Sequence, residues 1–359
     1  TSLTRTVSTD FSLNGVESGH KGSVSSCASF SPNGNYVAIG SGGYSFKLSV
    51  FSNSNGVLTE VDFVTPGYNV LAVDWSPDGN YIVLGCSNGS IRVYEFSGET
   101  LSQVGSTQNR SSSIDTVAWS PNGSYVAVGG TITGGVAFWI FSVSDGVLSG
   151  GSTGYSVVNS AYSLAWSPDS QYLAVGSYAY LRIFSLDGAV PSQVGSDYTS
   201  PVDVVYALAW HPGGDYLVVG GTERNDVTHR VYSVSAGILT EVGSGYYHGS
   251  KVNGVAWNSD GSRLLVAGSG SSGSVYREYT VSNGVLSLDV SGDSIAGYAY
   301  GVDWGSSGIV ISGVFYNYPT AYESSGIYSH SSGRLSRLSS YDTGYETNMI
   351  AVNSDETRF

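Results

Sequence analysis

Several residue types are scarce in this 359-residue chain, and each scarcity excludes a class of protein. Lysine occurs only at Lys21, Lys47 and Lys251, charged residues make up 12% of the sequence, and the net charge is −14. Nucleic-acid binding needs clusters of Lys and Arg that neutralise phosphates, so we expect no nucleic-acid partner. No apolar run approaches the ~18 residues of a membrane-spanning helix, so we expect no membrane span.

Cysteine and methionine are also rare. Two cysteines do not make a disulfide framework, and we expect Cys27 and Cys86 to be buried free thiols, with a bridge between them as the alternative. The chain begins at Thr1 and contains one Met, which favours a processed, secreted or cell-surface protein. Asn88 and Asn109 begin N-x-S sequences and are candidate glycosylation sites of such a protein.

What the chain has in abundance is one repeated unit, seen most clearly at residues 161–177, AYSLAWSPDSQYLAVGS. Alternating small and apolar residues end on Trp166, a Ser-Pro-Asp turn follows, and a second apolar run ends on Gly176. Period-two alternation, a turn with Pro and Asp, and a β-branched run together predict two antiparallel strands. The aromatic anchor recurs every 44 to 47 residues, at Phe30, Trp75, Trp119, Trp166, Trp210, Trp257 and Trp304.

Each pair of strands is followed by two more. The third strands are predicted at residues 46–51, 91–96, 136–141, 181–185, 229–234, 275–281 and 326–329. More polar fourth strands are predicted after a Gly-containing turn, for example at residues 57–63, 101–105, 238–243 and 335–339. A repeat of this length with four strands predicts an all-β β-propeller, in which each repeat forms one blade. The polar fourth strand suits the exposed outer edge of a blade.

The repeats resemble those of the WD40-like propeller family over essentially the whole chain, in their AWSPDG-like segments and in LAVGG-like second strands such as residues 216–221. The third strands depart from that family, because they end in sequences such as Val93-Tyr94-Glu95-Phe96 and not in Trp-Asp. The resemblance implies the architecture and says little about a partner.

The two ends of the chain predict an eighth repeat that is split between them. Residues 1–8 and 11–18 resemble third and fourth strands, and residues 348–355 resemble a first strand with its turn. We therefore expect a single domain over residues 1–359, with seven full repeats at about 23–341 and terminal strands within 1–18 and 347–359. The terminal strands either close the ring within one chain or pair with neighbouring chains.

No constellation of residues predicts catalysis or a cofactor. The five His show no metal-ligand spacing, and there is no nucleophile elbow, phosphate loop or calcium loop. His211 replaces a turn Ser, and we expect it to be a solvated turn residue. Asp74 and Asp303 precede anchor Trp residues where four repeats carry Ala, so they are either hydrogen-bonded structural carboxylates or part of a cation or substrate site near the central channel.

Tyrosines gather in the predicted connections of one propeller face. The candidate binding residues are Tyr68, Tyr155, Tyr246, Tyr247, Tyr298, Tyr316, Tyr318 and Tyr345. These side chains either cap the blade cores or form a recognition face for a protein or a glycan, because Tyr offers rigid amphipathic contact area. We therefore expect a non-enzymatic extracellular interaction scaffold, with a structural filament subunit assembled through the terminal strands as the alternative.

Overall fold

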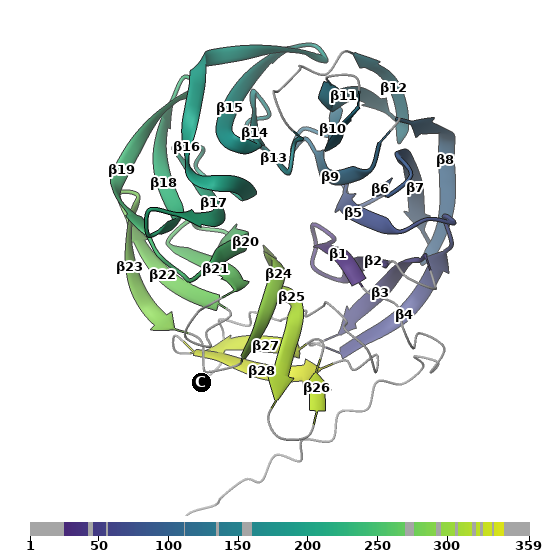
Figure 1. Ribbon diagram of the computed structural model, residues 1–359. Coiled ribbons are helices and arrows are strands. Elements are labelled where there is room, and N and C mark those ends of the chain that lie inside the picture. Colours follow the sequence, from purple (N-terminus) through teal and green to yellow (C-terminus); the bar gives the residue numbers. More distant parts are fainter. Residues whose placement is uncertain are drawn as a thin grey trace, which may run out of the picture.

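The computed structural model describes residues 25–41, 46–54, 57–110, 112–133, 136–152, 160–269, 276–291, 296–305, 308–317, 321–323, 326–331 and 334–340. These residues form β-strands and connections, and the strands are grouped into sheets around a central axis (Figure 1). The expectation of an all-β propeller is therefore confirmed. Within the described residues, no helix is long and apolar enough to cross a membrane.

In the part of the chain that the structure describes, seven sheets follow one another around the ring, each built from consecutive strands with the first strand innermost. The strands of the first three sheets are β1 (Ser25–Phe30), β2 (Tyr36–Ser41), β3 (Leu48–Ser54) and β4 (Val57–Val64); β5 (Val70–Trp75), β6 (Tyr81–Cys86), β7 (Ser90–Ser97) and β8 (Thr100–Asn109); and β9 (Ile114–Trp119), β10 (Tyr125–Thr133), β11 (Val136–Ser144) and β12 (Val147–Ser152). The fourth to sixth sheets contain β13 (Ser163–Trp166), β14 (Tyr172–Gly176), β15 (Tyr178–Asp187) and β16 (Val190–Trp210); β17 (Tyr216–Arg224), β18 (Val227–Ser235) and β19 (Ile238–Tyr246); and β20 (Lys251–Trp257), β21 (Arg263–Ser269), β22 (Tyr276–Ser282) and β23 (Val285–Ser291). The seventh sheet contains β24 (Ala296–Gly305), β25 (Gly308–Asn317), β26 (Ala321–Glu323), β27 (Gly326–Ser331) and β28 (Arg334–Ser340).

Strand β16 differs from the pattern because it belongs to two sheets. Its first half pairs with β15 as the outer strand of the fourth sheet, and its last residues pair with β17 as the inner strand of the fifth. A further pair, Thr222 with Lys251, joins β17 to β20. Hydrogen bonds therefore connect the fourth, fifth and sixth sheets into one 11-stranded network.

The predicted third and fourth strands are present, with ends that differ by a few residues. The hydrophobic core lies between neighbouring sheets; one cluster, for example, joins Leu48 and Val50 of the first sheet to Trp75 and Ile82 of the second. Outer strand β8 alternates mostly between exposed and half-buried residues, as an edge strand should. Cys27 and Cys86 are free thiols.

A glycine at the end of the second strand allows the sheets to approach closely. A Cβ added at Gly85 would lie 2.3 Å from Ile114, and one at Gly220 would lie 2.5 Å from Val252. Ile114 and Val252 belong to the innermost strand of the next sheet. The glycine that recurs at this point is therefore required by packing between sheets.

The first and seventh sheets also contact each other through β1 and β24. Their shared core cluster contains Phe30 and Val37 of the first sheet with Ala299 and Ile309 of the seventh. The predicted terminal strands in residues 1–18 and 347–359 lie outside the described residues.

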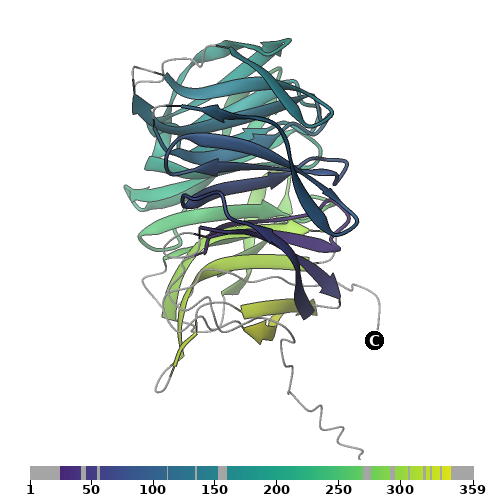
Figure 2. The same cartoon turned by 90° about the vertical axis from the view of Figure 1, so that its right-hand side faces the viewer.

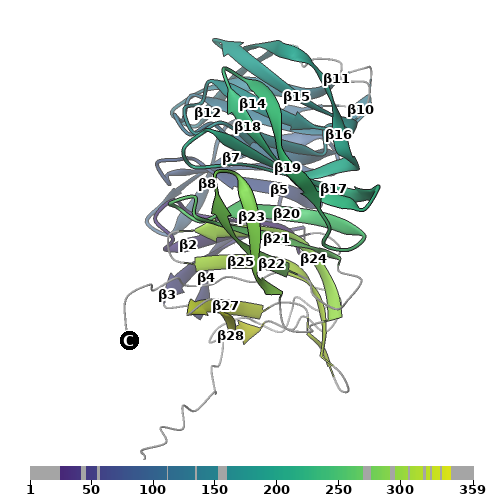
Figure 3. The same ribbon diagram turned by 90° about the vertical axis from the view of Figure 1, so that its left-hand side faces the viewer.

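The strands run from one face of the ring to the other (Figures 2 and 3). We call the face that carries the connections from the fourth strand of a sheet to the next sheet, and from second to third strands, the loop face. We call the opposite face, with the turns after the first and third strands, the turn face.

Candidate binding face

In six of the described sheets, the innermost strand carries one extra residue near the loop face. The ladders to the second strands skip a residue between Ser25 and Cys27, and between Val70 and Ala72, and the same break recurs in the third, fifth, sixth and seventh sheets. A residue left unpaired in this way is a β-bulge, which re-aims its side chain. In the fourth sheet, Tyr162 stands at the same position and its N–H donates to Gly176 O.

The bulge residues all lie four positions before the aromatic anchor, and together we call them the bulge ring. Its members are Ser26, Leu71, Asp115, Tyr162, Tyr206, Asn253 and Tyr300. They differ in chemistry, whereas the anchor that follows is always aromatic. The innermost strands surround the ring axis (Figure 1), so the bulge ring lies around the axis at the loop face.

The bulges also explain why several second strands end on two consecutive glycines or on a late glycine. A Cβ added at Gly130 would lie 2.0 Å from Ser113 O, one at Gly221 would lie 1.8 Å from Val204 O, and one at Gly268 would lie 2.0 Å from Lys251 O. The bulged backbone occupies that space, so a side chain at these positions would displace it.

Two tyrosines of the bulge ring form a cluster with Lys251, which lies two residues before the ring member Asn253. The rings of Tyr162 and Tyr206 lie 5.6 Å apart, and Lys251 Nζ lies 3.7 Å from the centre of the Tyr206 ring. Burial lowers the pKa of Lys251, and burial followed by Tyr162 raises the pKa of Tyr206. All three side chains remain partly exposed, so this cluster offers aromatic area and one cation to a partner.

Five of the tyrosines predicted from the sequence to form a binding face lie in the part of the chain that the structure describes, and their surroundings differ. Tyr68 and Tyr247 are exposed in connections of the loop face, as expected. Tyr246 instead caps the core: its ring stacks on His229 at 5.5 Å, and its hydroxyl accepts a hydrogen bond from Leu286 N.

The remaining tyrosine assignments need correction or cannot be followed. Tyr298 and Tyr316 were expected in loops, but they lie on β24 and β25, because the seventh sheet extends its strands into that region. Tyr155, Tyr318 and Tyr345 lie outside the described residues. Sequence reasoning missed Tyr162 and Tyr206; their constant spacing from the anchor was the available signal.

Asp74 and Asp303 have a structural role that the repeat explains. Anchor indoles usually donate to a carbonyl in the preceding sheet; the pairs are Trp75 to Ser29 O, Trp166 to Ala118 O, Trp210 to Ala165 O and Trp257 to Ala209 O. At two junctions between neighbouring sheets, the hydrogen bond from an anchor indole to the preceding sheet is missing. Phe30 has no indole, and the Trp119 indole donates to Gly123 O.

The two carboxylates supply the missing bonds. Asp74 accepts from Trp119 N at 2.7 Å, and Asp303 accepts from Phe30 N. Of the two interpretations of these residues, the hydrogen-bonded structural carboxylate is the one that the contacts support. Among the described residues, no group of three or more His, Cys, Asp or Glu is arranged to hold a metal.

The interpretation of His211 as a solvated turn residue is wrong. Its side chain is 18% exposed, and its ring packs edge-on against Trp257 at 5.0 Å and Tyr216 at 5.6 Å. His211 Nδ1 lies 2.6 Å from Asp215 Oδ1. Asp215 thus takes the place of the Asp or Asn that pairs with the turn Ser in other repeats. The larger side chain therefore fills space between the fifth and sixth sheets that Ser would leave open.

The candidate glycosylation residues are both exposed. The Asn88 side-chain oxygen accepts hydrogen bonds from the backbone N–H and the hydroxyl of Ser90, in the turn between β6 and β7. Asn109 is the last residue of β8.

Comparison with known proteins agrees with this architecture. A family model described as WD domain, G-beta repeat matches residues 11–52, 192–225 and 240–277. A second model, described as eukaryotic translation initiation factor eIF2A, matches residues 38–183. No curated protein sequence matches the chain.

Two solved structures illustrate the similarity. A chain in the crystal structure of the mitotic checkpoint complex is 16% identical, with 87% of this chain and 92% of that chain covered and a TM-score of 0.61. Sqt1 from Chaetomium thermophilum is 18% identical, with 83% and 80% covered and a TM-score of 0.60. At such identities the likeness shows the fold. Together with the matched repeats, it shows that the chain is similar to WD40-type β-propeller proteins.

Proposed function

We propose that the chain is a non-enzymatic scaffold that binds a partner protein through the bulge ring on its loop face. The observation that carries the proposal is the contrast between a regular frame and an irregular ring. Anchors, turns and glycines repeat, whereas the seven bulge residues differ in size, charge and polarity. Variable side chains on a rigid scaffold are the usual arrangement of a recognition surface.

The chemistry of the ring favours a protein over a glycan. Leu71 adds an apolar side chain, Asp115 adds a negative charge, and Tyr162 and Tyr206 add an aromatic pair. Lys251, which is not a ring member, adds a positive charge beside Tyr206. Protein interfaces combine aromatic anchors with polar and charged neighbours in this way. One structural neighbour is a chain of the mitotic checkpoint complex, which is consistent with such a role.

The test compares two matched variants in affinity capture from the source organism. Tyr162→Ser/Tyr206→Ser removes the aromatic pair, whereas Val190→Ser/Ile238→Ser removes two apolar side chains, 57% and 45% exposed, from the outer strands. We expect proteins captured by the wild type to be retained by the outer-strand variant and reduced at least about tenfold by the aromatic variant. Circular dichroism confirms folding of both variants. Equal capture by all three proteins contradicts the proposal, and binding of the wild type on a glycan array would replace the protein with a glycan.

An extracellular location is part of the proposal. Exposure of Asn88 and Asn109 supports it, because an acceptor asparagine must be accessible. Protein from its native source should shift in electrophoretic mobility after treatment with peptide N-glycosidase, and the shift should disappear in Asn88→Gln/Asn109→Gln. An unchanged mobility of the native protein would remove this support.

A filament subunit is the second candidate. It is favoured by the contact between β1 and β24, because a ring closed by these two strands does not require the strands predicted in the terminal segments. Negative-stain images of the intact chain should then show fibres that vanish when residues 1–18 and 347–359 are removed. Single monodisperse rings from the intact chain would contradict the filament candidate.

A further inference from the structure

The turn face is acidic. Exposed carboxylates project from its turns at Asp78, Glu99, Asp145, Asp169, Asp187, Asp215 and Asp260. None of the turns described on this face carries Lys or Arg. By contrast, several carboxylates elsewhere are neutralised, in the pairs Arg182–Asp197, Arg230–Glu241, Lys47–Glu60 and Arg224–Asp203. In the described part of this face, exposed carboxylates therefore outnumber cations, and Arg263 is the basic residue whose charge acts on one of them, Asp260.

Grooves between neighbouring sheets open on this face. The larger one, of about 630 Å³, lies between the second and third sheets and is lined by Asp78 and Tyr81 on one side and by Asp145 and Gly146 on the other. The Tyr81 ring is held in place, because it stacks on Trp119 with a centroid distance of 6.3 Å and packs against Gly146. Its hydroxyl thus stays beside the carboxylates.

The charged residues that act on the Tyr81 hydroxyl are all acidic. Burial raises the pKa of Tyr81, and the negative charges of Glu95, Asp145 and Asp78 raise it further. Burial also opposes ionisation of Asp78, but hydrogen bonds from Ser76 and Asn80 outweigh it and lower its pKa. The groove is therefore a fixed set of hydrogen-bond acceptors with negative charge.

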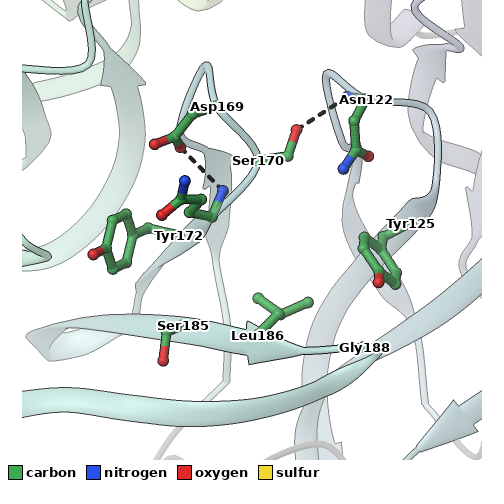
Figure 4. Close-up of a pocket in the computed structure, with 9 residues that line it drawn as sticks. Asn122, Tyr125, Asp169, Ser170, Tyr172, Ser185, Leu186 and Gly188 are labelled. Atoms are coloured by element: carbon green, nitrogen blue, oxygen red, sulfur yellow. Dashed lines mark hydrogen bonds between the residues drawn. The ribbon is translucent and has the colours of Figure 1, made fainter.

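A second groove of about 310 Å³ repeats the arrangement between the third and fourth sheets (Figure 4). Asp169, Tyr125 and Tyr172 line it, and Tyr125 stacks on Trp166 at 6.1 Å as Tyr81 stacks on Trp119. The Asn122 N–H donates to the Ser170 hydroxyl across the junction, which joins the two turns (Figure 4). The second groove therefore also combines tyrosine rings with an exposed carboxylate, Asp169, although Asn122 stands where the first groove has Asp78.

We propose that the turn face docks a basic segment of a second partner protein, whose Arg or Lys side chains enter the grooves between the sheets. A guanidinium or ammonium group carries only donors and a positive charge, which matches walls made of carboxylates and tyrosine hydroxyls. An anionic ligand such as nucleic acid would be repelled. Because the loop face is on the other side of the ring, this interaction can exist with or without the partner proposed there.

The repeats themselves supply conservative variants for the test. Asn33 and Asn122 occupy the position of Asp78 in other turns, and Asn283 occupies that of Asp145. Asp78→Asn/Asp145→Asn therefore removes two charges while keeping residues that these turns already accept. The matched control, Asp203→Asn/Asp226→Asn, removes two charges from the loop face.

The probe is a fluorescein-labelled peptide of nine arginines, titrated at low salt and followed by fluorescence anisotropy. We expect binding to the wild type, dissociation constants about fivefold higher for Asp78→Asn/Asp145→Asn, and a change below about twofold for the control. A photoreactive version of the peptide should crosslink to residues 76–81 or 143–146. Equal weakening by both variants, no weakening by either, or crosslinks on the loop face would each overturn the proposal, and thermal unfolding verifies that the variants are folded.

Discussion

At the scale of single residues, Asp74 shows how one carboxylate can join three sheets. Its oxygens accept hydrogen bonds from the Ser29 hydroxyl of the first sheet, from Trp75 N of its own sheet and from Trp119 N of the third. Burial raises the pKa of Asp74 to about 7, and the charge of Asp303 adds to the rise, although the hydrogen bonds oppose it. The Asp74 carboxyl group therefore accepts several hydrogen bonds but loses its proton with difficulty.

This raised pKa predicts a pH dependence of stability. Because the unfolded carboxyl ionises near pH ~3.9, the folded state holds the proton more tightly, and the contribution of Asp74 to stability is greatest below pH ~4 and falls as the pH rises through 7. Urea unfolding from pH 4 to 8 should show the wild type losing on the order of 2 kcal/mol relative to Asp74→Asn over this range. The same pH dependence of the free energy of unfolding in both proteins would contradict the account.

At the scale of elements, the regular parts were predictable and the irregular parts were not. Strand pairs and turns could be predicted because the Trp166 unit combines period-two alternation with a Ser-Pro-Asp turn, and such local signals survive in the fold. The bulges add one residue without changing composition, so the alternation pattern did not reveal the position of Tyr206, and its spacing from Trp210 was the available signal. The continuity of β16 was equally hidden, since Pro201 suggests a loop although it takes no part in the strand pairing.

The bulges nevertheless make a prediction of their own at this scale. A Cβ at Gly221 would lie 1.8 Å from Val204 O, so Gly221→Ala must move the bulge that presents Tyr206, at a cost of about 3 kcal/mol. Gly188→Ala is the control: it has φ of +60° but no atom within 4 Å, so only the backbone cost of about 1 kcal/mol applies. Denaturant unfolding measures both, and equal losses would show that the close approach is unimportant.

At the scale of the whole molecule, the ring separates two kinds of surface. The loop face carries the bulge ring with its aromatic pair and, beside it, Lys251, and the turn face carries exposed carboxylates. The sequence could predict the architecture, because the anchors recur at a fixed interval. It could not predict the bulge ring, since its members are adjacent only after seven repeats have closed around one axis, with Asp303 bonded to Phe30 at the last junction.

The most direct test of the bulge ring as the binding surface is hydrogen–deuterium exchange of the chain with and without its captured partner. The account predicts slower exchange in the segments that carry the bulges, at residues 68–71, 112–115, 160–162, 202–206 and 250–253, and no change in the outer strands β8, β12 and β19. Protection confined to those outer strands, with unchanged exchange around Tyr162 and Tyr206, would contradict it.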